Sequence, residues 1–325
     1  MPVLGRLGSG WFGGRAELAL ASLSPAQDSP QFGNDLYRPS SAKKLSAASE
    51  TCSAPGCTGG WVKPWKNRRR PIFEGSWGCS GRCLEDLVRL AVRRETGEGA
   101  VLSEEVHRHR IPLGLVLLAQ GWITHPQLQA ALQAQKENGD GRIGDWLMQG
   151  AGLSEERITR GVSMQWNCPV LSLDAFSPTV MARVMPKRFI AEFGLIPLRV
   201  AGSTLLYLAF EEKMNAATAL AVEQMSGLAV ESGLLSATQF NQARSSLLAA
   251  DGIPVTVNQF ADADALARGI INALEQRQPI AARLVRVHHY YWLRMWLESG
   301  ARSGAGTIPP TGEDVQDHVF RIGNR

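Results

Sequence analysis

This 325-residue sequence has a low net charge, few cysteines and few long hydrophobic runs. The net charge is only +4, which does not by itself indicate nucleic-acid binding, because that function needs clustered positive charge. Five cysteines, four of them close together, argue against a disulfide framework running through the whole chain. Hydrophobic residues make up 44% and charged residues 20%, close to the globular norm, so the chain can bury a core. The length predicts about two domains.

Segments that would direct the chain into a membrane are also missing. The first 24 residues contain Arg6, Arg15 and a short apolar stretch at 18–23, but their order and glycine content do not fit a signal peptide. Residues 111–135 lack Asp, Glu, Lys and Arg and are long enough to cross a bilayer. They contain five Gln, a His and two Pro, a pattern that favours amphipathic helices. We therefore expect no membrane span and a cytoplasmic location.

The pattern along the chain predicts an α+β protein. Residues 1–50 are rich in Ser, Gly and Pro and are expected to be a disordered arm. Residues 51–95 hold four cysteines and one helix, in a small zinc-knuckle-like module. A tandem helix-turn-helix repeat is expected at 105–170, followed by a small mixed α/β domain at 171–298. Residues 299–325 are expected to be a flexible tail.

The tandem repeat is visible as matches at an offset of 30 residues. Each unit predicts a short helix, a glycine-containing turn and a second helix. Thr124 followed by Gln127 predicts a capping box, and Ser154 predicts the N-cap of the last helix. The matched pairs are Leu113 and Ile143, Gly114 and Gly144, Leu117 and Leu147, Leu128 and Ile158, Leu132 and Val162, and Gln135 and Gln165.

The α/β part alternates helical and β-rich segments. Cys168, which precedes Pro169, is expected to be a small core residue. His288 and His289 lie within one expected strand, where neighbouring side chains face opposite ways, so they would not share a metal. Helices are expected at 178–189, 216–225, 236–249 and 263–277, and strands at 195–200, 204–210, 228–231, 255–257 and 283–297.

Four cysteines form two close pairs, Cys52 with Cys57 and Cys79 with Cys83. Two such pairs on turns can supply the four thiolates of a tetrahedral zinc site. Two disulfides or unrelated free thiols are the alternatives, and a reducing cytoplasm favours zinc. The basic run at 63–70 lies between the pairs, beside Trp61. A solvated loop of the zinc module accounts for this run better than nucleic-acid binding does.

Residues 112–165 resemble the doubled motif of the N-terminal domain of type II secretion and type IV pilus assembly ATPases, often called the MshEN domain. The first copy reads Pro-Leu-Gly from Pro112 and the second Arg-Ile-Gly from Arg142, each followed by aliphatic positions, a Gly turn and a closing Gln. The segment that follows, from Met185 to Phe210, also looks like that family. The resemblance covers about residues 105–235.

The resemblance implies a bacterial signalling module that binds cyclic di-GMP, each motif copy holding one half of the ligand. Glycines at helix starts let backbone amides approach a phosphate, and an arginine can contact the O6 and N7 edge of guanine. The implied ligand-binding residues are Leu113, Gly114, Leu117, Gly121, Gln135, Arg142, Ile143, Gly144, Leu147 and Gln165.

Two positions depart from the family pattern. Pro112 stands where the first copy should have Arg, and Ala151 where the second should have Gly. The alternative function is therefore a scaffold of the same fold that docks a secretion or pilus protein without nucleotide. The family's ATPase signature, a Gly-rich loop ending in Lys and Ser or Thr, is absent from the sequence. Since no catalytic set replaces it, we expect a non-enzymatic protein.

Overall fold

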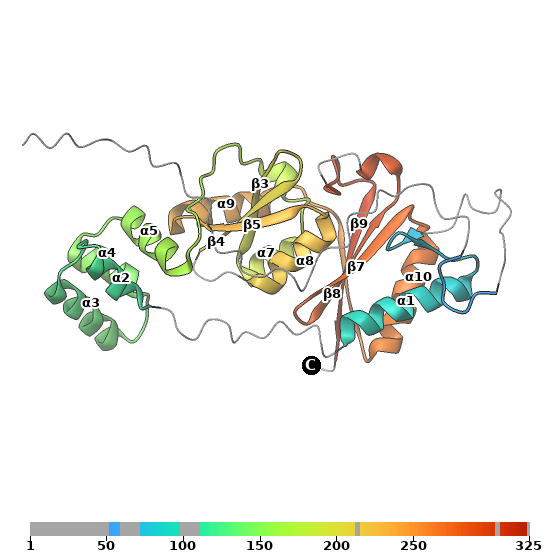
Figure 1. Ribbon diagram of the computed structural model, residues 1–325, viewed down its shortest axis with the longest axis horizontal. Coiled ribbons are helices and arrows are strands. Elements are labelled where there is room, and N and C mark those ends of the chain that lie inside the picture. Colours follow the sequence, from blue (N-terminus) through green and yellow to red (C-terminus); the bar gives the residue numbers. More distant parts are fainter. Residues whose placement is uncertain (1–51, 59–71, 98–110, 212–214, 303–305, 324–325) are drawn as a thin grey trace, which may run out of the picture. The chain divides into compact units, whose positions relative to one another are not determined.

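The computed structural model describes residues 52–58, 72–97, 111–211, 215–302 and 306–323 (Figure 1). The expected arm at 1–50 and the basic run at 63–70 lie outside these ranges. None of the helices described in these ranges is long and apolar enough to cross a membrane.

Four helices follow one another from residue 113 to residue 166. They are α2 (Leu113–Ala119), α3 (His125–Asn138), α4 (Ile143–Ala151) and α5 (Glu155–Trp166). The predicted capping box opens α3, where the Thr124 side chain and the Gln127 side chain each bond the other's backbone. Ser154 precedes α5 as predicted, but its side chain makes no capping bond. The shared core contains Leu117, Ile123, Leu128, Ala131, Leu147 and Leu153.

A small three-stranded sheet follows these helices. Strand β4 (Leu205–Phe210) lies in its middle, antiparallel to β3 (Leu195–Ala201) and parallel to β5 (Ala229–Leu234). Helix α8 (Ala216–Ser226) connects β4 to β5, and α9 (Ala237–Ala249) follows β5. The helix expected at 178–189 is broken into α6 (Pro178–Met181) and α7 (Lys187–Phe193), because Pro186 lacks the N–H that a continuous helix needs there.

A second sheet has six strands in the order β2-β1-β7-β8-β9-β6. It joins two parts of the chain that are far apart in sequence. The early part supplies β1 (Ile72–Phe73) and β2 (Ser76–Trp77), followed by helix α1 (Gly81–Thr96). The late part supplies β6 (Val255–Phe260), α10 (Ala263–Arg277), β7 (Ala281–Val287), β8 (Tyr290–Trp296) and β9 (Val315–Ile322).

Both faces of this sheet are covered over its central strands. Helices α1 and α10 pack beside each other on one face (Figure 1), where Val88, Ile270 and Leu293 belong to one buried cluster. On the other face, Trp292 joins the large core that also contains Phe189, and the two rings meet edge to face at 5.7 Å. The sheet is therefore central to the late part of the chain, and the cysteine segment is one of its elements.

Three expectations for this region are wrong. The strand expected at 283–297 is the hairpin β7–β8, with His288 and His289 in its turn.

The two ends of the described chain are also part of the sheet. The expected flexible tail at 299–325 contains β9, which is buried at Val319 and pairs with both β8 and β6. The module expected at 51–95 does not stand alone, because Phe73 pairs with Ala282 and lies in the core under α1. The tail and the cysteine segment are each too short to bury their apolar residues without the rest of the sheet.

Candidate functional site

The four cysteines Cys52, Cys57, Cys79 and Cys83 form one cluster. Their sulfur atoms all lie within 4.8 Å of one another. The Sγ of Cys79 is 3.5 Å from the Sγ of Cys57 and 3.5 Å from that of Cys83. Because metal–sulfur bonds in a tetrahedral zinc site are about 2.3 Å long, the edges of that tetrahedron are about 3.8 Å. The cluster therefore has the dimensions of a tetrathiolate metal site, and these four residues could hold a metal ion.

Two local structures position the four thiols. Cys52 and Cys57 flank a turn in which Gly56 has a φ of +78°, and the Cys57 amide donates to the carbonyl of Ala54. Cys79 precedes α1, and Cys83 lies in its first turn, where its amide donates to the N-cap Ser80 side chain. The turn is joined to the sheet, since the Ser53 amide donates to the carbonyl of Trp77 at 2.9 Å.

The electrostatics of the cluster favour negative charge on one of its sulfur atoms, that of Cys52. Burial raises the pKa of Cys52, but hydrogen bonds from the amides of Ala54 and Cys79 and from neighbouring thiols outweigh it, so that the pKa is about 7. Hydrogen bonds with Cys57 and Cys83 raise the pKa of Cys79 to about 12. One sulfur is thus stabilised as a thiolate by the other groups, and thiolate is the form that binds metal.

The two motif copies build the same helix contact. A Cβ on Gly114 would lie 2.6 Å from Cδ1 of Leu128, and a Cβ on Gly144 would lie 3.0 Å from Cγ2 of Ile158. Glycine at both positions therefore lets the two helices of each copy pack closely, and a Cβ there would force the Leu128 or Ile158 side chain to shift. Sequence reasoning had assigned these glycines to phosphate approach alone and had not identified this packing role.

The closing glutamines of the two copies make reciprocal contacts. The Gln135 side chain donates to the carbonyl of Gly141 at 2.8 Å, just before Arg142 starts the second copy. The Gln165 side chain donates to the carbonyl of Ile111 at 2.7 Å, just before Pro112 starts the first copy. Each glutamine side chain thus bonds the backbone at the start of the other copy.

The helix starts differ in charge. Arg142 is the N-cap of α4, and its side chain is 47% exposed. One of its guanidinium nitrogens is 2.6 Å from a carboxylate oxygen of Glu211, which follows β4. Pro112, the N-cap of α2, supplies neither charge nor a side-chain cap. Among the described residues, the second copy is therefore the one that presents a cation at its helix start.

The departure at Ala151 has a local explanation. Gly121 turns the chain after α2 with a φ of +66°, and in the second copy Gly152 makes that turn with a φ of +64°. Helix α4 extends through Ala151, so the left-handed position moves one residue along the chain.

The remaining predicted site residues differ in accessibility. Leu117 and Leu147 have no exposed surface and belong to the core of the four helices. Leu113 and Ile143 are partly buried against that core, whereas Gly121 is exposed. The aliphatic positions of the motif thus support the site more than they line it.

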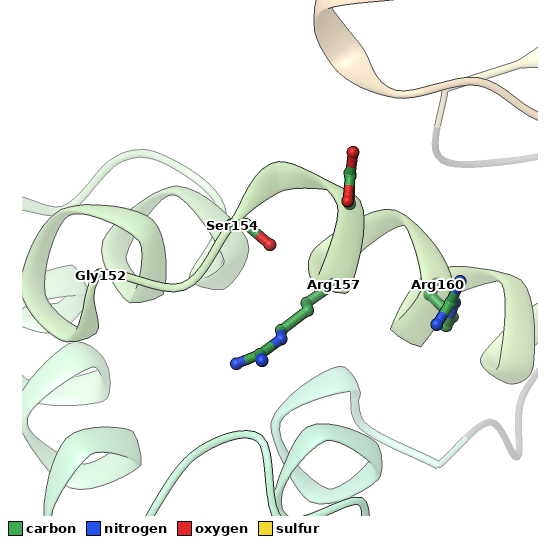
Figure 2. Close-up of a pocket in the computed structure, with 5 residues that line it drawn as sticks. Gly152, Ser154, Arg157 and Arg160 are labelled. Carbon is green, nitrogen blue, oxygen red and sulfur yellow. The ribbon is translucent and has the colours of Figure 1, made fainter.

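A cavity of about 430 Å³ lies beside the start of α5 (Figure 2). Gly152, Ser154, Glu156, Arg157 and Arg160 line it. Both arginines are exposed, and neither makes an ion pair with any residue in the described ranges. Neither arginine is a motif position of the repeat, although their spacing of three residues already predicts that they share one side of a helix.

His288, His289 and Cys168, which the sequence analysis also considered, have different contacts. His288 Nε2 is 2.7 Å from the side-chain oxygen of Asn215, whereas His289 Nε2 is 3.5 Å from Glu192. Burial lowers the pKa of His289. Cys168 is partly buried against the large core, and its carbonyl accepts a bond from Ser163.

Comparisons with known proteins give a fold likeness for part of the chain. No protein-family model and no curated protein matches it. A solved structure of MshE with cdg has 23% identity and a TM-score of 0.35, over 42% of this chain and 98% of that one. The N-terminal domain of XpsE, in one crystal form, has 18% identity and a TM-score of 0.30, over 41% and 92%. Each of these two matches covers about two fifths of this chain.

Proposed function

We propose that the four-helix unit binds cyclic di-GMP across its two motif copies and performs no catalysis. The observation that supports this best is the reciprocal pair of glutamine contacts, which holds the start of each copy against the end of the other. Such a pair of helix starts suits a ligand made of two identical halves. Helix N-termini carry partial positive charge and free amides, which favour phosphates.

Arg142 is the residue that would recognise the base. It is exposed at the start of α4 and has the planar donor fork that contacts the O6 and N7 edge of guanine. At the first copy, Pro112 offers no equivalent group. Binding would therefore depend mainly on the second copy.

Calorimetric titration of cyclic di-GMP into the full chain tests this function. One bidentate guanine contact typically contributes about 1–3 kcal/mol, so Arg142→Ala should weaken binding by roughly 5- to 150-fold. Pro112→Arg, which restores the family residue, should strengthen it. Arg268→Ala, an equal charge change at an exposed position on α10, is the matched control and should have no effect. If neither the wild type nor Pro112→Arg binds, the nucleotide function is wrong.

A scaffold function is the second candidate. It is favoured by the missing cation at Pro112 and by exposed apolar side chains on the same unit, namely Ile111, Leu115 and Leu132. A protein of a secretion or pilus system would dock on this unit without nucleotide. Failure of both titrations, with the fold intact by circular dichroism, would favour this function.

We further propose that the cysteine cluster holds one zinc ion. Four thiolates at these separations fit zinc, which prefers closed tetrahedral sulfur sites when its role is structural. Zinc would join the turn at Cys57 to the start of α1 at Cys79. Because the turn at 52–58 has no large apolar residues of its own, the metal would supply much of the stability of that turn.

Metal analysis with a matched variant tests the zinc proposal. We expect about one zinc per chain, lost in Cys79→Ser or Cys57→Ser but kept in Cys168→Ser, which changes the cysteine outside the cluster. Cobalt substitution should give the intense visible absorption of a tetrahedral thiolate site. Protein without bound metal, with all four cluster thiols open to alkylation, would contradict it.

A further inference from the structure

Most strand edges in the described residues are protected against pairing with another chain. Strand β2 is only two residues long, and its Trp77 carbonyl accepts the amide of Ser53. Strand β3 contains Pro197, where its register with β4 shifts. The outer side of β5 is bonded to the segment before it, since the amide of Leu171 donates to the carbonyl of Leu234. Short strands, prolines, bulges and covering segments are the usual protections of sheet edges.

Within the part of the chain that the structure describes, strand β6 has none of these protections. It forms the other end of the six-stranded sheet and reads Val-Thr-Val-Asn-Gln-Phe, with no charge and no proline. Its first five residues are exposed, including Val255 at 37% and Val257 at 52%. Its one strand partner in the described ranges is β9. An uncharged, β-branched open edge of this length is a site that accepts another strand.

The bonds to β9 show which backbone groups of β6 point outward. The carbonyl of Pro254 accepts the amide of Asp317 at 3.0 Å, and that of Phe260 accepts the amide of Gly323 at 3.1 Å. Because alternate residues of a strand bond to the same side, the even-numbered residues face β9. Val255, Val257 and Gln259 therefore direct three N–H and three C=O groups away from the sheet.

We propose that β6 pairs with β6 of a second copy of this chain, antiparallel, about a two-fold axis at Val257. The outward residues are symmetric about Val257, so Val255 would face the copy's Gln259, and Val257 would face itself. Each of the three pairs exchanges two backbone hydrogen bonds, so all six outward groups are satisfied. The strand carries no charge, so no like charges oppose each other within it. A two-fold dimer is also the commonest symmetric assembly.

This pairing would give the exposed valines a partner surface. Val255 and Val257 lie on one face of the strand, where Val257 would contact the same residue of the second copy. The two six-stranded sheets would become continuous. An extended peptide from another protein would use the same edge, but it would not make the chain self-associate.

Light scattering and sedimentation of the full chain over a range of micromolar concentrations test the proposal. We expect a dimer, and Val257→Pro should weaken it by roughly tenfold or more, because two central hydrogen bonds are lost. Proline is tolerated on an edge where its missing N–H faces outward, so the β9 bonds remain. Val257→Thr keeps the N–H and the branched shape, and should remain dimeric.

Two further measurements keep the test sharp. Val257→Lys leaves the backbone intact and places two ammonium groups opposite each other, so it should also dissociate the dimer. Hydrogen exchange should show the amides of Val255, Val257 and Gln259 protected only at high concentration, with those of Thr256 and Asn258 protected throughout. A chain that stays monomeric, or a dimer that both substitutions leave unchanged, would overturn the proposal.

Discussion

On the nucleotide function proposed above, Glu211 should compete with cyclic di-GMP for Arg142. A carboxylate oxygen of Glu211 is 2.6 Å from a guanidinium nitrogen of Arg142, and the two side chains are 23% and 47% exposed, respectively. Arg142 cannot contact guanine through the same nitrogen until this bond breaks. Ligand binding therefore forms the contact between Arg142 and guanine and breaks the ion pair between Arg142 and Glu211.

The magnitude follows from the exposure of the pair. An ion pair that is this accessible to water typically contributes about 0.2–1 kcal/mol. Glu211→Gln should therefore strengthen cyclic di-GMP binding by roughly 1.5- to 5-fold. Because salt screens exposed charges, the difference between Glu211→Gln and the wild type should shrink at high ionic strength.

Calorimetric titration of both proteins at low and high salt measures this effect. The double variant Glu211→Gln with Arg142→Ala should bind no better than Arg142→Ala alone, because the carboxylate then has no arginine to release. A Glu211→Gln protein that binds more weakly than the wild type would refute the reasoning. That result would mean that Glu211 orients Arg142 for the ligand.

Three further predictions concern the stability of the six-stranded sheet and of the four-helix unit. Arg294 is 1% exposed and donates to both carboxylate oxygens of Asp317 at 2.8 Å. Asp317→Asn would leave it as an unpaired buried charge, so this substitution should lower the free energy of unfolding in urea by about 3–5 kcal/mol. Burial lowers the pKa of His318 in the native protein, so below about pH 6.5 the unfolded chain binds more protons than the native one. The free energy of unfolding should therefore fall as the pH is lowered, and it should fall less in His318→Gln. Gly114→Ala should cost about 1–3 kcal/mol through overpacking, whereas Gly150→Ala, where a Cβ meets open space in α4, should gain up to about 1 kcal/mol; equal effects in thermal unfolding would contradict the packing role of Gly114.

Local features of the helical unit could be predicted from the sequence. The capping box at Thr124 and the glycine turn at Gly121 depend on a few neighbouring residues, so their patterns are visible without tertiary information. The same holds for the two cysteine pairs, since a close pair on a turn is a local arrangement. The structure adds that all four sulfur atoms lie within 4.8 Å of one another. The spacing of the cysteines predicts such a cluster for a zinc site, but two disulfides or unrelated free thiols fit the same spacing.

Contacts between distant segments were decided by the tertiary structure. Nothing near Phe73 shows that it pairs with Ala282, more than two hundred residues away, because strand partners are chosen by burial across the whole core. The end of the chain looked flexible because its glycines and prolines are local turn signals, yet β9 completes the sheet between β8 and β6. The open edge at Val257 is likewise a property of the finished sheet, since a strand has an edge only after its neighbours are known.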